Sequence, residues 1–135
     1  MVVRRGEAER GGTLRDGKGM LRVGSGIIEA PFNWGSRFAQ GAATSPKELI
    51  AAAHAGSYSM SVSSRLGQAG HPAKRIHTAA RATIEMPEGH RAIIGIALDT
   101  ETDVPWMDEA PRAGIAEAPR TGCRSRGRWR PWPSP

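Results

Sequence analysis

The sequence has 135 residues, which is enough for one domain with a hydrophobic core. It has neither an 18-residue apolar run nor an apolar segment behind its N-terminal charges, so we expect a cytoplasmic protein without a membrane span or a signal peptide. Its single cysteine excludes an internal disulfide framework. Its net charge of +6 does not indicate a nucleic-acid binder, because five arginines cluster near the C-terminus and the remaining 14 basic residues nearly balance the 13 acidic ones.

The first third of the chain alternates turn signals with short apolar runs. Residues 16–19, "DGKG", are typical of a hairpin turn, because Asp-Gly and Lys-Gly pairs tolerate positive φ angles. Residues 20–32 predict one or two strands, broken at Gly24–Gly26. Residues 33–45 are rich in glycine and serine, which favours a loop.

A long helix follows this loop. Ser45 is a good N-cap, Pro46 suits the first helical position, and Glu48 completes a capping box three residues after the serine. The glycines and proline of residues 66–72 predict where the helix ends. Between these limits, small and apolar residues recur at helical spacing: Leu49, Ala53, Gly56, Met60.

Two runs of β-type residues come after the helix, at 73–87 and 90–105. The turn signal Pro87-Glu88-Gly89 between them predicts a hairpin. Residues 106–123 have helical composition, interrupted by Pro111 and Pro119. Strands, a long helix, further strands and a last helix in this order predict an α+β domain rather than a doubly wound parallel sheet.

The residues alone indicate little catalytic chemistry. No two histidines share a metal-binding spacing and no CxxC motif occurs, so we expect neither a metal nor a cofactor. His54 and Ser57 are neighbours on the predicted helix, but the sequence places no acid to orient the histidine as a base for a serine nucleophile. Both residues are therefore interpreted first as packing or surface residues.

A family resemblance is carried by five motifs in order: "DGKG", "GSRF", "SPKELIAAAHAGSYSM", "LGQAG" and the pair Gly122-Cys123. Together they resemble the OsmC/Ohr family of thiol-dependent organic hydroperoxide reductases, and its OsmC branch in particular. The resemblance covers roughly residues 7–123. In that family the helix motif typically reads NPEELIxAAHAxCFSM.

The resemblance implies an intertwined homodimer of α+β subunits, with antiparallel sheets, a long central helix and active sites at the subunit interface. It also implies a defence against oxidative and osmotic stress. In such a site, an arginine holds a peroxidatic cysteine as a thiolate, and a glutamate at the helix start orients that arginine. The thiolate attacks an organic hydroperoxide, a second cysteine resolves the sulfenic acid as a disulfide, and a dithiol reductant restores both thiols.

Carried over to this chain, Arg37 takes the arginine position and Cys123 the position of the resolving cysteine. Ser57 falls on the peroxidatic position, and Lys47 falls on the position of the glutamate. A serine hydroxyl neither ionises like a thiol nor forms a sulfenic acid. Lys47 replaces the carboxylate partner of Arg37 by a like charge. We therefore expect a member whose peroxidase activity is impaired or lost. A deliberate Cys-to-Ser change would account for Ser57 alone, so natural divergence is the preferred interpretation.

The C-terminal tail, residues 124–135, breaks the resemblance abruptly, where the family continues with Cys-Pro-Val-Ser, a helix and a last strand. We therefore expect an OsmC-like domain over 1–123 and a basic, Trp- and Pro-rich tail that is disordered or results from a shifted reading frame, with the C-terminal helix and strand truncated or altered. Five arginines in this tail or just before it account for five of the six net positive charges: Arg120, Arg124, Arg126, Arg128, Arg130.

Three functions follow from these features. The first is an impaired OsmC-type hydroperoxide reductase that acts as a homodimer. The second is a non-catalytic protein that binds a small apolar ligand in the same pocket. The third, which the near-neutral body disfavours, is a nucleic-acid binder that uses the basic tail.

Overall fold

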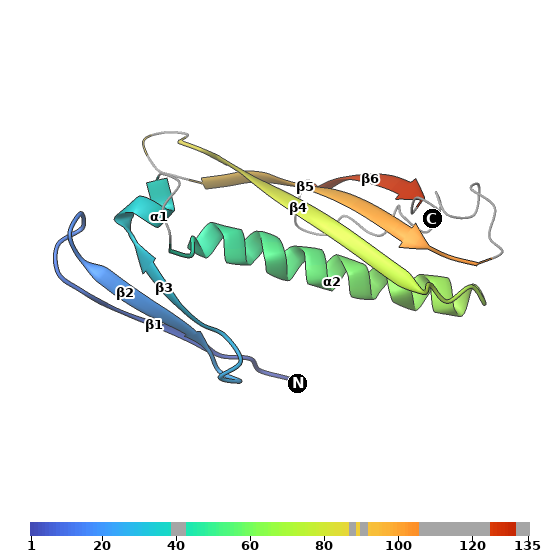
Figure 1. Cartoon of the computed structure of the whole chain (residues 1–135), viewed down its shortest axis with the longest axis horizontal. Coiled ribbons are helices and arrows are strands. Elements are labelled where there is room, and N and C mark those ends of the chain that lie inside the picture. The colour runs from blue at the N-terminus through green and yellow to red at the C-terminus, as the bar shows by residue number, and fades with distance from the viewer. Residues whose placement is uncertain (39–42, 87–88, 90–91, 106–124, 132–135) are drawn as a thin grey trace. The chain divides into compact units, whose positions relative to one another are not determined.

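The computed structural model describes residues 1–38, 43–86, 89, 92–105 and 125–131. The chain forms two compact units, residues 1–49 and residues 50–135 (Figure 1). Each unit contains one three-stranded sheet. Among the described residues, no helix combines the length and the apolar character that a membrane span requires.

The first unit contains an antiparallel meander of β1 (Gly6–Gly11), β2 (Lys18–Val23) and β3 (Glu29–Asn33). The turn between β1 and β2 is closed by a hydrogen bond from the Gly17 amide to the Thr13 carbonyl oxygen, at 2.9 Å. A Cβ at Gly17 would clash with that same oxygen. The predicted hairpin is confirmed, although its turn covers residues 12–17 and Lys18 and Gly19 already belong to β2. The predicted break at Gly24–Gly26 is also confirmed, because these residues lie between β2 and β3.

A short helix, α1 (Trp34–Phe38), lies within the stretch for which composition predicted a loop, so that prediction is wrong over these residues. The Ser36 amide donates to Asn33 Oδ1 at 2.8 Å, and the Asn33 amide donates to Ser36 Oγ at 3.1 Å. These reciprocal bonds satisfy two amides at the helix start, which is why a segment rich in Gly and Ser adopts a helical turn.

Helix α2 (Pro46–Gln68) begins and ends where the sequence predicted. At its start the Ser45 amide lies 3.5 Å from Glu48 Oε2, which is the return bond of the capping box. At its end Gly70 adopts φ +79°, its amide donates to the Gly67 carbonyl oxygen, and the His71 amide donates to the Leu66 carbonyl oxygen. This pair of bonds is a Schellman motif, which glycine permits because it tolerates a positive φ.

The second unit contains β4 (Arg75–Glu85) and β5 (Ala92–Asp103), which form the predicted antiparallel hairpin, and β6 (Ser125–Pro131), which pairs with β5 in parallel. Figure 1 shows α2 running along this sheet. The core between them is built by Val62 and Leu66 of the helix and Val104, all buried. An antiparallel first sheet, a mixed second sheet and a long helix packed on the second sheet confirm the predicted α+β class.

The tail differs from expectation over part of its length. Residues 125–131 form β6, although their Arg and Pro content predicted disorder. The parallel bonds to β5 supply partners for the backbone of this segment, which composition alone does not reveal. The shifted reading frame stays a prediction, and the expected helical segment 106–123 lies outside the described residues.

Candidate site on helix α2

Ser57 lies midway along α2, and its side chain is exposed. It belongs to a stripe of exposed residues that recur every three or four positions, and we call these residues the outer stripe of α2. Ile50 and Met60, which flank Ser57 on the stripe, are 48% and 74% exposed. The outer stripe consists of Ile50, Ala53, Ser57, Met60 and Ser64.

The opposite side of α2 faces the second sheet. Ser59 Oγ donates to Thr78 Oγ1 of β4 at 2.8 Å, and Thr78 Oγ1 lies 3.1 Å from Thr100 Oγ1 of β5. Tyr58 packs against the buried core of Val62, Leu66 and Val104. Burial raises the pKa of the Tyr58 phenol, and the charge of Arg65 lowers it by a smaller amount.

The positions expected to accompany Ser57 are carried by other elements. Arg37 is in α1 of the first unit, directly after the buried Ser36. Lys47 is the second residue of α2 and is half-buried, while its neighbour Glu48 takes part in the helix cap. Cys123 lies outside the described residues. The roles of all four residues therefore stay predictions.

Two groups of polar residues near these positions were not predicted from the sequence. The first is the pair Asn33 and Ser36, which begins α1 and thereby sets the backbone that carries Arg37. The spacing Asn-x-x-Ser was the available signal, because both residue types cap helices. The second is the hydroxyl chain from Ser59 through Thr78 to Thr100, which joins three elements and has no local sequence signal.

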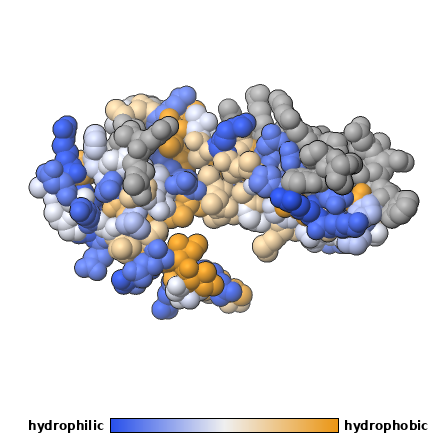
Figure 2. Space-filling view, in the orientation of Figure 1, coloured by the Kyte–Doolittle hydropathy of each residue, from blue (hydrophilic) through white to orange (hydrophobic). Residues whose placement is uncertain are grey.

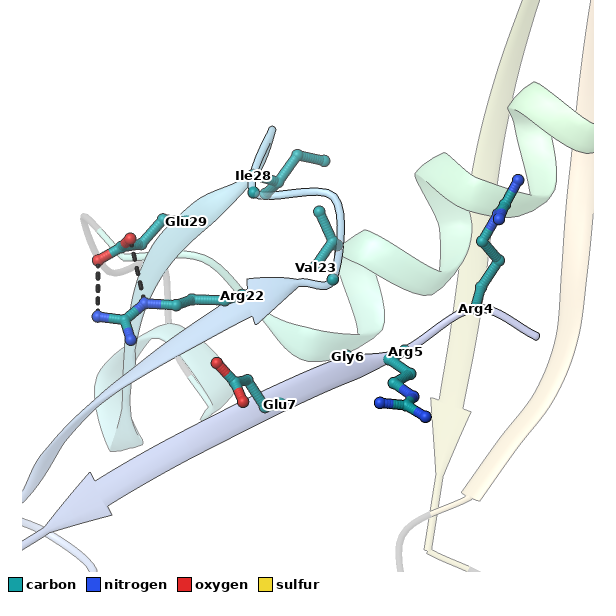
Figure 3. Close-up of a pocket in the computed structure, with 10 residues that line it drawn as sticks. Arg4, Arg5, Gly6, Glu7, Arg22, Val23, Ile28 and Glu29 are labelled. Carbon is teal, nitrogen blue, oxygen red and sulfur yellow. Dashed lines mark hydrogen bonds and ion pairs between the residues drawn. The ribbon is translucent and has the colours of Figure 1, made fainter.

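A cavity of about 690 Å³ lies at the end of the first sheet, between the N-terminal segment and the turn that joins β2 to β3. Figure 3 shows its charged lining, in which Arg22 forms an ion pair with Glu29 at 3.1 Å. Arg4 and Arg5 contribute from the segment before β1. Both partners of the ion pair are half exposed, so water weakens their attraction. None of the sequence-predicted site residues lines this cavity.

The turn beside this cavity is also apolar. Ile27 and Ile28 are 84% and 44% exposed, and Figure 2 shows hydrophobic surface at this end of the first sheet. Within the described ranges, no three of His, Cys, Asp and Glu lie close enough together to hold a metal ion.

Solved structures define the class of fold. The chain superposes on the organic hydroperoxide resistance protein OhrB of Bacillus subtilis with a TM-score of 0.68 at 14% identity, covering 93% of this chain and 98% of that one. An organic hydroperoxide resistance protein OsmC from Legionella pneumophila gives a TM-score of 0.69 at 13% identity, covering 97% and 98%. The chain thus has the OsmC-like α+β fold.

Sequence comparison then gives the family. The chain is 36% identical over 123 residues to the peroxiredoxin OsmC of Escherichia coli (strain K12), covering 90% of this chain and 86% of that protein. The peroxiredoxin OsmC of Shigella flexneri matches to the same extent. No family model matches the chain. On the strength of these relatives the chain belongs to the OsmC/Ohr family, a family of hydroperoxide reductases.

Proposed function

We propose that this chain is an OsmC-type hydroperoxide reductase by descent, in which Ser57 and Lys47 replace the peroxidatic cysteine and the glutamate that orients Arg37. In its present form it reduces organic hydroperoxides negligibly. The observation that carries this proposal is the composition of α2, whose 23 residues include no cysteine, while the one cysteine of the chain is at position 123.

The reaction of a thiol peroxidase requires a cysteine at the position that Ser57 occupies here. In a thiol peroxidase, the thiolate sulfur attacks one oxygen of the O–O bond, the other oxygen leaves as an alcohol after taking up a proton, and the sulfur becomes a sulfenic acid. A second thiol then displaces water to form a disulfide, which a dithiol reduces. With serine at position 57 the first step has no nucleophile, so Cys123 has no sulfenic acid to resolve.

A homodimer is part of the proposal, and helix geometry supports it. Positions 47 and 57 are ten residues apart on one helix, which is about 15 Å along its axis. One chain therefore cannot bring both positions to the same small site through α2 alone. A second copy can supply the missing position, and the outer stripe, with Ile50 and Met60 exposed beside Ser57, offers apolar surface for such a contact.

Three proteins test the catalytic part: the original chain, Ser57→Cys, and Ser57→Cys with Lys47→Glu. The assay is loss of cumene hydroperoxide in the presence of a dithiol reductant. We expect no turnover by the original chain and weak turnover by the single variant. The double variant should be faster than the single one by a factor on the order of ten to a hundred, because a carboxylate at position 47 orients Arg37 toward the thiolate.

Ser64→Cys is the matched control, since Ser64 is also exposed on the outer stripe. It places a thiol two turns away, and we expect it to leave the protein inactive. Robust turnover by the original chain would refute the proposal. A dimeric double variant no faster than the single one would refute the assigned role of Lys47.

The dimer is tested by light scattering at micromolar concentration. We expect a dimer for the original chain and a monomer for Met60→Glu, because the change buries a charge in the contact. Met86→Glu is the control, since Met86 is 60% exposed but lies after β4, away from the outer stripe. A monomeric original chain would count against the interface, as would dissociation caused equally by both changes.

Binding of a small apolar ligand is the second candidate function, and the exposed Ile50 and Met60 on either side of Ser57 favour it. Its test uses a fluorescent apolar probe with the original chain and with Met60→Glu. Saturable binding by the original chain that the variant loses would support this function. Equal binding by the two proteins would exclude it from the outer stripe.

A further inference from the structure

We propose that Thr78 and Thr100 are positioning residues for the side chain at position 57. Their hydroxyl groups, with that of Ser59, form a chain that fixes the rotation of α2 on the second sheet, and this rotation directs position 57 away from the sheet. The inference rests on the proposed function, because that function gives position 57 its chemical role.

The hydroxyl chain crosses three elements. Ser59 Oγ on α2 donates to Thr78 Oγ1 at 2.8 Å, and Thr78 Oγ1 lies 3.1 Å from Thr100 Oγ1. Thr78 and Thr100 are also register partners in the antiparallel pair of β4 and β5. Thr100 is only 1% exposed, so its hydroxyl group takes its hydrogen-bond partner from this row of hydroxyl groups and not from water.

The apolar contacts of α2, among them that of Tyr58 beside position 57, hold the helix on the sheet but constrain its rotation less than a hydrogen bond does. Val62 and Leu66 are fully buried in the core beyond Ser59, toward the helix C-terminus. On the N-terminal side, the buried residue of α2 is Ala51, which offers a single methyl group. Apolar packing is non-directional, whereas a buried hydrogen bond demands a defined distance and angle. Ser59 supplies such a bond two residues from position 57.

Because both residues are on one helix, the hydrogen bond of Ser59 also determines the direction in which the side chain at position 57 points. Residues two positions apart on an α-helix are about 200° apart around its axis. When the Ser59 side chain points to the sheet, that of Ser57 must point nearly the opposite way, and Ser57 is indeed exposed. Releasing Ser59 therefore lets α2 rotate and changes the surroundings of position 57.

The experiment uses the whole chain with Ser57→Cys and Cys123→Ser, so that position 57 carries the one thiol. The rate of alkylation by iodoacetamide is measured from pH 5 to pH 10, which gives both the reactivity and the pKa of that thiol. Thr78→Val keeps the shape of the side chain but removes the hydroxyl, and we expect it to lower the rate at pH 7 by about fivefold. Thr78→Ser keeps the hydroxyl and should restore the rate. Ser59→Ala removes the hydroxyl group that α2 contributes to the same hydrogen bonds, and it should reproduce the loss.

Val62→Ala is the control for a merely structural effect, because it loosens the same helix–sheet contact while leaving the hydroxyl chain intact. We expect its alkylation profile to match the parent. The inference fails if Val62→Ala and Thr78→Val slow alkylation equally, or if Thr78→Ser behaves like Thr78→Val. Reaction with cumene hydroperoxide is measured separately. An effect on alkylation without any reaction with peroxide would support the positioning role and refute the proposed function. Reaction with peroxide without an effect on alkylation would support the proposed function and refute the positioning role.

Discussion

The hydroxyl of Ser36 lies 3.0 Å from the carbonyl oxygen of Thr44, eight residues further along the chain. Ser36 is 8% exposed and also bonds Asn33 through both its amide and its side chain. The amide of Thr44 in turn donates to the Pro31 carbonyl oxygen of β3 at 2.9 Å. One small side chain thus joins the start of α1 to the segment that leads into α2.

We expect Ser36→Ala to lower the free energy of unfolding by about 1–3 kcal/mol, because it leaves partly buried backbone groups of Asn33 and Thr44 without this partner. Urea denaturation measures this loss. Ser63→Ala, an exposed change on α2, is the control and should shift the free energy of unfolding by about 0.5 kcal/mol or less. Equal effects of the two changes would show that the Ser36 bonds contribute nothing to stability.

Leu66 is fully buried between α2 and the second sheet. Leu66→Ala should destabilise the protein by about 2–5 kcal/mol, since it removes buried methyl groups and leaves a cavity. Met86→Ala, at a residue that is 60% exposed, should cost far less. Thermal unfolding of both variants checks the difference, and a Leu66→Ala protein as stable as Met86→Ala would mean that this core does not hold the helix.

Tyr58 is the one tyrosine of the chain, and burial raises the pKa of its phenol. The folded state therefore holds the phenolic proton more tightly than the unfolded state. The stabilisation from this difference is complete below the unfolded pKa of about 10 and is lost as the pH rises through the folded value. Tyrosinate absorbance should give a midpoint above 10, and Tyr58→Phe should remove this part of the alkaline loss of stability. A midpoint at or below 10 would contradict the burial argument.

Lys47 places a positive charge in the first turn of α2, where the helix dipole favours a negative one. Lys47→Glu should raise the free energy of unfolding by about 0.3–1 kcal/mol at low ionic strength. The gain should shrink in 1 M salt, because salt screens the interaction. Lys74→Glu changes the charge equally outside the helix and is the control. A gain common to both variants would reflect net charge and not the dipole.

The sequence predicted the parts of the fold that depend on local interactions. Ser45, Pro46 and Glu48 define the start of α2, and Gly70 defines its end through a local backbone geometry. The prediction failed for α1, where the composition favoured a loop. The two hydrogen bonds between Asn33 and Ser36 stabilise a helical turn there instead. The prediction failed for β6 because its pairing with β5 is a tertiary interaction.

The candidate site, too, could be predicted from the sequence only in part. The family motif indicates position 57 from the sequence alone, and the helix that carries it was correctly predicted. The hydroxyl chain behind that position was not predictable, because Thr78 lies 19 residues from Ser59 and 22 from Thr100. Nothing in the local sequence of a strand threonine distinguishes one that meets a helix serine from one that faces water.

Among the described strands, β6 is the one that runs parallel to its neighbour, and it has a consequence for the order of folding. The antiparallel pairs join strands that follow one another in the chain, so short loops close them at small entropic cost. β6 must instead return to Ile96, the partner of Ser125, after the chain has passed the far end of β5. Non-local parallel pairing is slow, so we expect the N-terminal meander and the β4–β5 hairpin to form first, and the C-terminal strand to join a sheet that already exists.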